Sequence, residues 1–157
     1  MGQSTVWSRW IALGFVAAVG LAVVPIRAGA QWHAEVLPGV RFGAPLRAGF
    51  ALGVTYGTQV SFAQFAGPIA IAEAGLGGGR VSGGYLLAFP FASGIEVLAS
   101  AVRTWGSPLK ADGKETLAGG ELRGSFFSVN VGVGIFRPVV SGNDRRTRIY
   151  MNVGFGI

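Results

Sequence analysis

The chain has 157 residues, of which 13% are charged and 27 are glycine, and its mean hydropathy is positive. This composition is too apolar for a disordered chain and has no collagen-like period, so it indicates one folded domain. The basic residues behind the formal net charge of +6 are scattered rather than clustered, which argues against a nucleic-acid-binding protein. The absence of cysteine excludes disulfides and a lipoprotein-type anchor.

The first thirty residues have the layout of a cleavable signal peptide. Arg9 supplies a positive charge, and residues 11–24 form an apolar run that is short for a membrane-spanning helix. Ala28-Gly29-Ala30 then offers a cleavage site made of small residues. We therefore expect a signal peptide at residues 1–30 and a mature domain at residues 31–157, with an uncleaved anchor helix as the alternative.

The mature chain alternates between apolar residues and small or polar residues, which is the period of β-strands. Segments rich in Gly, Pro, Asn and Asp separate the alternating stretches and indicate turns. We expect a bend or bulge at Pro38-Gly39, and a loop at residues 57–66 with some strand character. The eight expected strands are 31–42, 46–56, 68–76, 80–89, 95–105, 116–124, 126–136 and 148–157.

The last of these segments alternates most strictly, with small or polar residues opposite an apolar face. A soluble sheet normally turns Lys, Thr or Glu to water. An apolar outer face with an inner face of small or polar residues is typical of a small membrane barrel. Lipid cannot form hydrogen bonds with the N–H and C=O groups at an open sheet edge. Closing the sheet pairs these groups of the first strand with those of the last. The predicted fold is therefore all-β, a single antiparallel up-and-down β-barrel of about eight strands.

The charged residues of the expected strands fall mostly on the face opposite the apolar residues. An eight-stranded barrel is just wide enough for its interior to be filled by side chains, and buried charges require partners. Such a network would block the lumen; a narrow ion path or a proton-linked gate is the alternative. The predicted lumen charge network consists of Glu35, Glu73, Glu96, Glu121, Arg47, Arg80, Arg123 and Arg148.

Aromatic residues near the strand ends are candidates for the interfaces of a bilayer, although ordinary packing on a barrel surface would place them similarly. Arg103 falls on the outward face, where it could reach the lipid headgroups. The candidate interface aromatics are Trp32, Tyr56, Tyr85, Phe89 and Trp105. The side chains expected to point outward include Phe50, Leu87, Val97, Phe127, Val131 and Phe155.

No catalytic, cofactor-binding or metal-binding set is predicted. The glycine-rich stretch at residues 75–84 lacks the Gly-Lys-Ser/Thr ending of a phosphate-binding loop and precedes a strand. His33 is the one histidine, and no spacing indicates a nucleophile and an orienting partner for it.

The signal peptide, the alternating strands and the final strand together resemble the small eight-stranded outer-membrane barrels of Gram-negative bacteria, the OmpA/OmpX-like class. The resemblance implies that the outer-membrane assembly machinery recognises the last strand, which in that class usually ends in Phe. Here the sequence ends in Ile, and a Phe stands two residues earlier on the same face. The implied assembly signal is Ile149, Met151, Val153, Phe155 and Ile157.

This resemblance implies a location in the bacterial outer membrane, with the lipid bilayer and the assembly machinery as partners and no cofactor. The expected role is non-enzymatic: structural, envelope-stabilising or surface-interacting. A soluble periplasmic β-barrel that binds a small apolar ligand is the main alternative, and a lipid-modifying barrel enzyme is another. The membrane barrel and the soluble binder differ in which face of the sheet is apolar. A soluble binder buries its phenylalanines inside, whereas a membrane barrel exposes them on the outside.

Overall fold

The computed structural model describes residues 33–60, 63–105, 114–140 and 146–156. The signal peptide predicted at residues 1–30 lies outside these ranges, as do Trp32 and Ile157. Within the described ranges there is no helix with the length and apolar character needed to cross a membrane.

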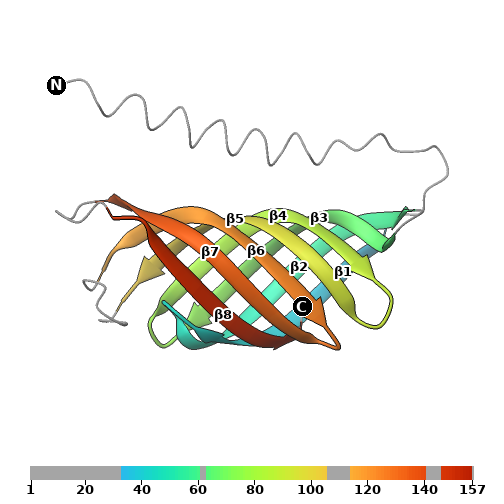
Figure 1. The fold of residues 1–157 in the computed structure, drawn as a ribbon, viewed down its shortest axis with the longest axis horizontal. Coiled ribbons are helices and arrows are strands. Elements are labelled where there is room, and N and C mark those ends of the chain that lie inside the picture. Colours follow the sequence, from blue (N-terminus) through green and yellow to red (C-terminus); the bar gives the residue numbers. More distant parts are fainter. Residues whose placement is uncertain (1–32, 61–62, 106–113, 141–145, 157) are drawn as a thin grey trace, which may run out of the picture.

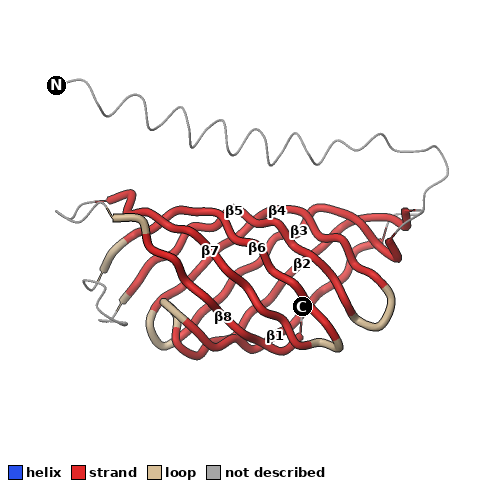
Figure 2. Tube along the Cα trace, viewed as in Figure 1, coloured by secondary structure: helices blue, strands red, loops and turns tan. Residues whose placement is uncertain are grey.

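The described chain forms one antiparallel sheet in which each strand pairs with the next, and β8 pairs with β1 to close a barrel (Figure 1). The predicted all-β, up-and-down sheet of eight strands that closes in a ring is therefore confirmed. Figure 2 shows the strands running obliquely around the barrel, as closure of a sheet requires. The strands are β1 (His33–Gly43), β2 (Arg47–Val60), β3 (Ala63–Gly75), β4 (Gly78–Phe89), β5 (Ser93–Thr104), β6 (Thr116–Phe126), β7 (Val129–Val140) and β8 (Arg148–Gly156).

Two expected boundaries are wrong. The expected loop at residues 57–66 is largely strand, because β2 and β3 continue to pair beyond a register shift between Thr58 and Val60. The expected strand at residues 126–136 begins too early, since Phe127 and Ser128 form the β6–β7 turn, both with positive φ. Phe127 is exposed in that turn rather than on a strand face. Neither turn residue is Gly or Asn, so the usual signal for this conformation is missing.

The expected bulge at Pro38-Gly39 is also wrong. β1 pairs with β2 without a shift from His33 to Gly43, so all of β1 keeps a single alternation of faces. The ladder between β1 and β8 begins only at Gly39. Pro38 therefore lies at the end of that ladder, an edge position where its missing N–H is tolerated.

The outer wall of the barrel is apolar. Side chains predicted to point outward are exposed, for example Phe50 at 76% and Val97 at 60%, while Leu87 is half-buried. The alternation holds within single strands: on β2, Leu52 and Val54 are exposed, while Ala51 before them and Thr55 after them are buried. Burial therefore follows the period of two that the sequence shows.

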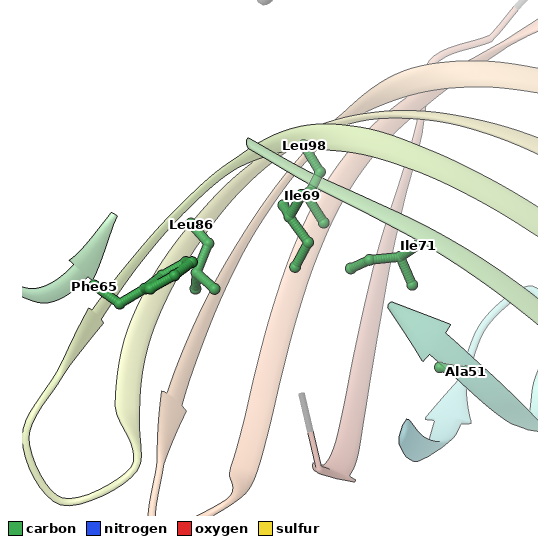
Figure 3. Close-up of a cluster of buried hydrophobic side chains, with 6 residues drawn as sticks. All are labelled: Ala51, Phe65, Ile69, Ile71, Leu86 and Leu98. Atoms are coloured by element: carbon green, nitrogen blue, oxygen red, sulfur yellow. The ribbon is translucent and has the colours of Figure 1, made fainter. Parts of the chain in front are cut away.

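Two apolar clusters fill much of the interior. The first, drawn in Figure 3, comes from β2, β3, β4 and β5 and consists of Ala51, Phe65, Ile69, Ile71, Leu86 and Leu98. The second combines Leu46 of the β1–β2 turn with Val102, Leu117 and Phe136, and Tyr150 packs against it. Buried polar and charged side chains occupy the rest of the interior.

Candidate functional site

A set of buried ionisable side chains joins five strands across the lumen and is named here the charge cluster. It takes one residue from β1, β3, β4 and β5 and two from β6, and each is at most 6% exposed. Its members are Arg41, Glu73, Arg80, Glu96, Glu121 and Arg123. Three arginines face three glutamates, so the cluster is neutral when all six are ionised.

Arg123 of β6 is the centre of the charge cluster because its guanidinium contacts all three carboxylates. Its Nη2 donates to Glu73 Oε1 at 2.9 Å, and its Nη1 lies 3.5 Å from Glu96 Oε2. Its Nε donates to Glu121 Oε1 at 2.5 Å. The Arg123 side chain is 1% exposed. A single planar group thus connects β6 to β3 and β5 in addition to the neighbour on its own strand.

Arg80 of β4 closes the network. Its Nε donates to Glu73 Oε2 at 2.9 Å, and its Nη1 donates to Glu121 Oε2 at 2.8 Å. Asn152 of β8 donates from Nδ2 to Glu121 Oε1 at 2.7 Å. Glu73 and Glu121 therefore each bridge Arg80 and Arg123, which satisfies the buried carboxylate oxygens that burial would otherwise penalise.

Arg41 of β1 is the least satisfied member. Its Nε lies 3.4 Å from Glu73 Oε1, and none of its three guanidinium nitrogens has a hydrogen-bond partner although all are buried. Arg41 was not among the predicted lumen residues, and a bulge at Pro38 would have changed the face on which it lies. With β1 unbroken, the alternation that half-buries Leu37 on the inner side also points Arg41 inward.

Glycines on the facing strands make room for the charge cluster. A Cβ on Gly132 of β7 would lie 2.8 Å from Glu121 Oε1 and 2.9 Å from Arg123 Cγ. A Cβ on Gly154 of β8 would lie 2.9 Å from Arg41 Cγ. The small inward residues of β7 and β8 are therefore the space that the long charged side chains occupy.

Three predicted members of the lumen network lie outside the charge cluster. Glu35 lies on the inward face of β1 but is exposed, because β8 pairs with β1 only from Gly39 onward. Arg47 is exposed at the start of β2. Arg148 is half-buried at the start of β8, where it makes an ion pair with Glu115.

The pair of Glu115 and Arg148 forms a separate site near the ends of β5, β6 and β8. Arg148 Nη2 donates to Glu115 Oε1 at 3.1 Å, and Nη1 contacts the other oxygen. The Glu115 backbone N–H donates to Thr104 Oγ1 at 3.0 Å, which fixes this carboxylate against β5. Glu115 was not predicted, because this residue precedes β6 and takes no part in the alternation of a strand.

The predicted outward-facing groups occupy the barrel surface. Tyr56 and Trp105 are exposed, and Tyr85 and Phe89 are half-buried. Arg103 is exposed and donates to Thr116 Oγ1 at 2.5 Å. Four of the residues proposed as an assembly signal share the exposed face of β8: Ile149, Met151, Val153 and Phe155.

The described residues hold no group of three or more His, Cys, Asp or Glu side chains arranged to bind a metal ion. His33 is exposed at the start of β1, and Glu35 beside it is exposed as well. The arginines and glutamates of the charge cluster pair with one another, so what its geometry does is join strands and occupy the lumen. Comparison with protein-family models, with curated proteins and with solved structures finds no match.

Proposed function

We propose that this chain is a small integral outer-membrane barrel with a structural, non-enzymatic role, and that the charge cluster seals its lumen. The single observation that supports this most is the inverted distribution of side chains. Apolar residues cover the outside and ionised residues fill part of the inside. A soluble barrel would place these two classes the other way round.

The apolar exterior is too extensive for a protein surrounded by water. Large exposed apolar side chains belong to every strand except β3, with Phe50 at 76% and Met151 at 65% exposure. A soluble monomer rarely exposes contiguous apolar patches of more than a few hundred Å². Hydrocarbon around the wall would remove this surface from water.

The interior argues against the alternative of a soluble ligand-binding barrel. Two apolar clusters and the charge cluster occupy it, and the cavity beside Arg41 has a volume of about 10 Å³. A larger hollow of about 640 Å³ is lined mainly by outward-facing side chains such as Phe50, Leu52 and Val81, so it lies on the outer wall and not in the lumen. A small-molecule site requires roughly 300–1,000 Å³. Among the described residues the lipid-modifying alternative has no supporting geometry either, because His33 is exposed and no hydroxyl side chain there is hydrogen-bonded to it.

The connections between strands support an orientation in the membrane. At the end where β1 begins and β8 ends, the connections are short, at residues 61–62, 90–92 and 127–128. At the opposite end, named here the loop end, two connections are longer, at residues 105–115 and 141–147. Outer-membrane barrels have short periplasmic turns and longer extracellular loops. The loop end is accordingly proposed to face the cell exterior.

The proposal includes export and assembly. The signal peptide at residues 1–30 would direct the chain out of the cytoplasm and be removed before Gln31. The assembly machinery would then act on the apolar face of the last strand, and the bilayer would be the permanent partner.

Fractionation tests this proposal. The protein should sediment with outer membranes, begin at Gln31 by N-terminal sequencing, and migrate differently on gels before and after heating. In planar bilayers the purified protein should show no steady conductance, because the charge cluster blocks the lumen. Recovery in the soluble periplasmic fraction without detergent would overturn the membrane location, and ohmic conductance would overturn the sealed lumen.

A further inference from the structure

The hollow on the outer wall has the size of a ligand site. Its volume is about 640 Å³, within the range of roughly 300–1,000 Å³ that such sites occupy. The side chains that line it come mainly from β2, β3, β4 and β5 and mostly point outward, and it is named here the outer groove. They include Phe50, Leu52, Ala72, Ala74, Val81 and Arg103.

A step in side-chain size forms one wall of the outer groove. Among the described strands β3 is the one without a large exposed apolar side chain, and its outward residues here are Ala70, Ala72 and Ala74. Phe50 and Leu52 of β2 stand opposite Ala74 and Ala72 in the register, and they are 76% and 54% exposed. The bulky side chains of β2 therefore stand beside a low floor made by the alanines of β3.

This low floor continues along the strands away from the loop end. Ala70 and Gly83 form the next outward pair across β3 and β4, and a Cβ on Gly83 would meet nothing within 4 Å. The pair of Pro68 and Tyr85 ends the floor. From Ala74 to Pro68 is six residues, roughly 20 Å along a strand, which the tilt of a membrane barrel reduces to about 15 Å of depth. That is half of a hydrocarbon core of roughly 30 Å, the depth of one leaflet.

A cation stands at the loop end of the outer groove. Arg103 of β5 is exposed and donates to the neutral hydroxyl of Thr116 at 2.5 Å, and among the described residues it has no ion pair. Trp105 lies over Gly79 of the floor, where a Cβ would be 3.0 Å from its Cη2. Arg and Trp side chains commonly reach the headgroups while their apolar parts stay in hydrocarbon. The outer groove is thus apolar along its length and positive at one end.

We propose that the outer groove binds one anionic phospholipid, with an acyl chain along the floor and the phosphate group on Arg103. The inference rests on the membrane location proposed above. An acyl chain is apolar over the length of one leaflet, and the floor has that length. The phosphate supplies the negative charge that Arg103 lacks among the described residues, and its oxygens accept charge-assisted hydrogen bonds from a guanidinium.

A second copy of the chain fits the outer groove less well than a lipid does. Two copies related by a two-fold axis present the same surface to each other, so that surface must be complementary to itself. Here a hollow would face a hollow and leave space between the copies. In a membrane the two Arg103 side chains would also lie at the same depth, with like charges facing each other.

Quenching of Trp105 by brominated lipid tests the site. In residues 31–157 the variant Trp32→Phe leaves Trp105 as the single tryptophan. This protein is refolded into phosphatidylcholine vesicles that contain a small, constant fraction of anionic phosphatidylglycerol, and the bromine is carried on the acyl chains of one lipid or of the other. Per brominated molecule, phosphatidylglycerol should quench Trp105 roughly fivefold more, the contribution of one Arg near an anionic surface.

Variants of the same protein assign this preference to the outer groove. Arg103→Gln should abolish it, and Arg103→Lys should keep most of it because the charge remains. Ala72→Leu places a larger side chain on the floor and should lower the preference. Ala34→Leu is the matched control, since it makes the same change on the outer face of β1, away from the groove, and should keep the preference.

The outcomes separate this inference from the membrane location. Equal quenching by the two brominated lipids would overturn the selective site and leave the membrane barrel standing, because Trp105 would still contact lipid. A preference that survives both Arg103→Gln and Ala72→Leu would place the anionic lipid elsewhere and also overturn the assignment. Absence of quenching in protein that sediments with the vesicles would mean that a second copy covers the groove. Protein that stays in solution would overturn the membrane location itself.

Discussion

Replacing Arg123 by methionine should destabilise the barrel more than any other single change in the charge cluster. The change keeps most of the side-chain volume but removes the one group that contacts Glu73, Glu96 and Glu121. Two arginines would then face three buried carboxylates, leaving a net charge of −1 inside the barrel. Breaking a buried ion pair in this way costs about 3–5 kcal/mol, which is roughly a 10²- to 10⁴-fold change in the folding equilibrium.

The size of the effect is measured by urea unfolding in a non-ionic detergent, followed by tryptophan fluorescence. A second variant separates charge imbalance from lost packing. Among the described residues the ion pair of Glu96 is with Arg123, so Arg123→Met combined with Glu96→Gln leaves two arginines and two glutamates. This double variant should recover at least half of the free energy that the single variant loses.

Arg103→Met is the matched control, since it removes an exposed guanidinium from the outer wall. It should change the unfolding free energy by about 1 kcal/mol or less. The reasoning is refuted if Arg123→Met costs no more than this control. It is also refuted if the double variant is as unstable as the sum of its two single variants, because a shared charge imbalance could not then be the cause.

Three further changes, two of them with a matched control, test the packing, the charge cluster and the outer face. Gly132→Ala should lower the unfolding free energy by about 1–3 kcal/mol, because its Cβ would press on the charge cluster. Gly124→Ala should stay within about 0.5 kcal/mol, since a Cβ there meets nothing within 4 Å; equal losses would contradict this. Arg41→Met leaves the same charge imbalance but breaks no hydrogen bond, so it should cost less than Arg123→Met in the same urea assay. Phe155→Asp should lower the yield of refolding into lipid vesicles and cost about 1–2 kcal/mol beyond Phe155→Ala, and equal behaviour of the two would mean that this face is not in lipid.

The faces of the strands could be predicted because a period of two assigns each residue to one side of a sheet. Glu73, Glu96 and Glu121 each stand between small or apolar outward neighbours, so alternation alone placed them inside. The same alternation placed Arg80 and Arg123 inside the barrel. Neither pair partners nor distances were needed for that step, since the pleat of the strand fixes the direction of each side chain.

The height of a residue along the barrel could not be predicted in the same way. Glu35 and Arg41 lie on the same face of β1, yet one is exposed and the other is buried. The difference depends on the stagger between β1 and β8, which starts their ladder at Gly39. Stagger is a property of the closed barrel, and no single strand carries it in its sequence.

Turns and irregular pairs were the other source of error. The β6–β7 turn has positive φ at Phe127 and Ser128, which are residues that seldom adopt that conformation, so alternation appeared to continue through it. At Pro38 the opposite error occurred, because the residue suggested a break that the edge of the β1–β8 ladder makes unnecessary. One wrong break was enough to hide Arg41, a buried member of the charge cluster.

Collision measurements on single spin labels test the central claim, an apolar wall in contact with lipid, most directly. The chain has no cysteine, so single cysteines can be labelled in urea before refolding into bilayers. Phe91 in the β4–β5 turn serves as the water-exposed control. The outward positions to be tested, one on each of four strands, are Leu52, Val97, Val131 and Met151.

Labels at these four positions should collide often with oxygen, which concentrates in hydrocarbon, and rarely with a water-soluble nickel chelate. The label at Phe91 should show the reverse preference. If the nickel chelate reaches all four strand positions as readily as it reaches Phe91, the outer wall lies in water and the proposed membrane barrel is wrong.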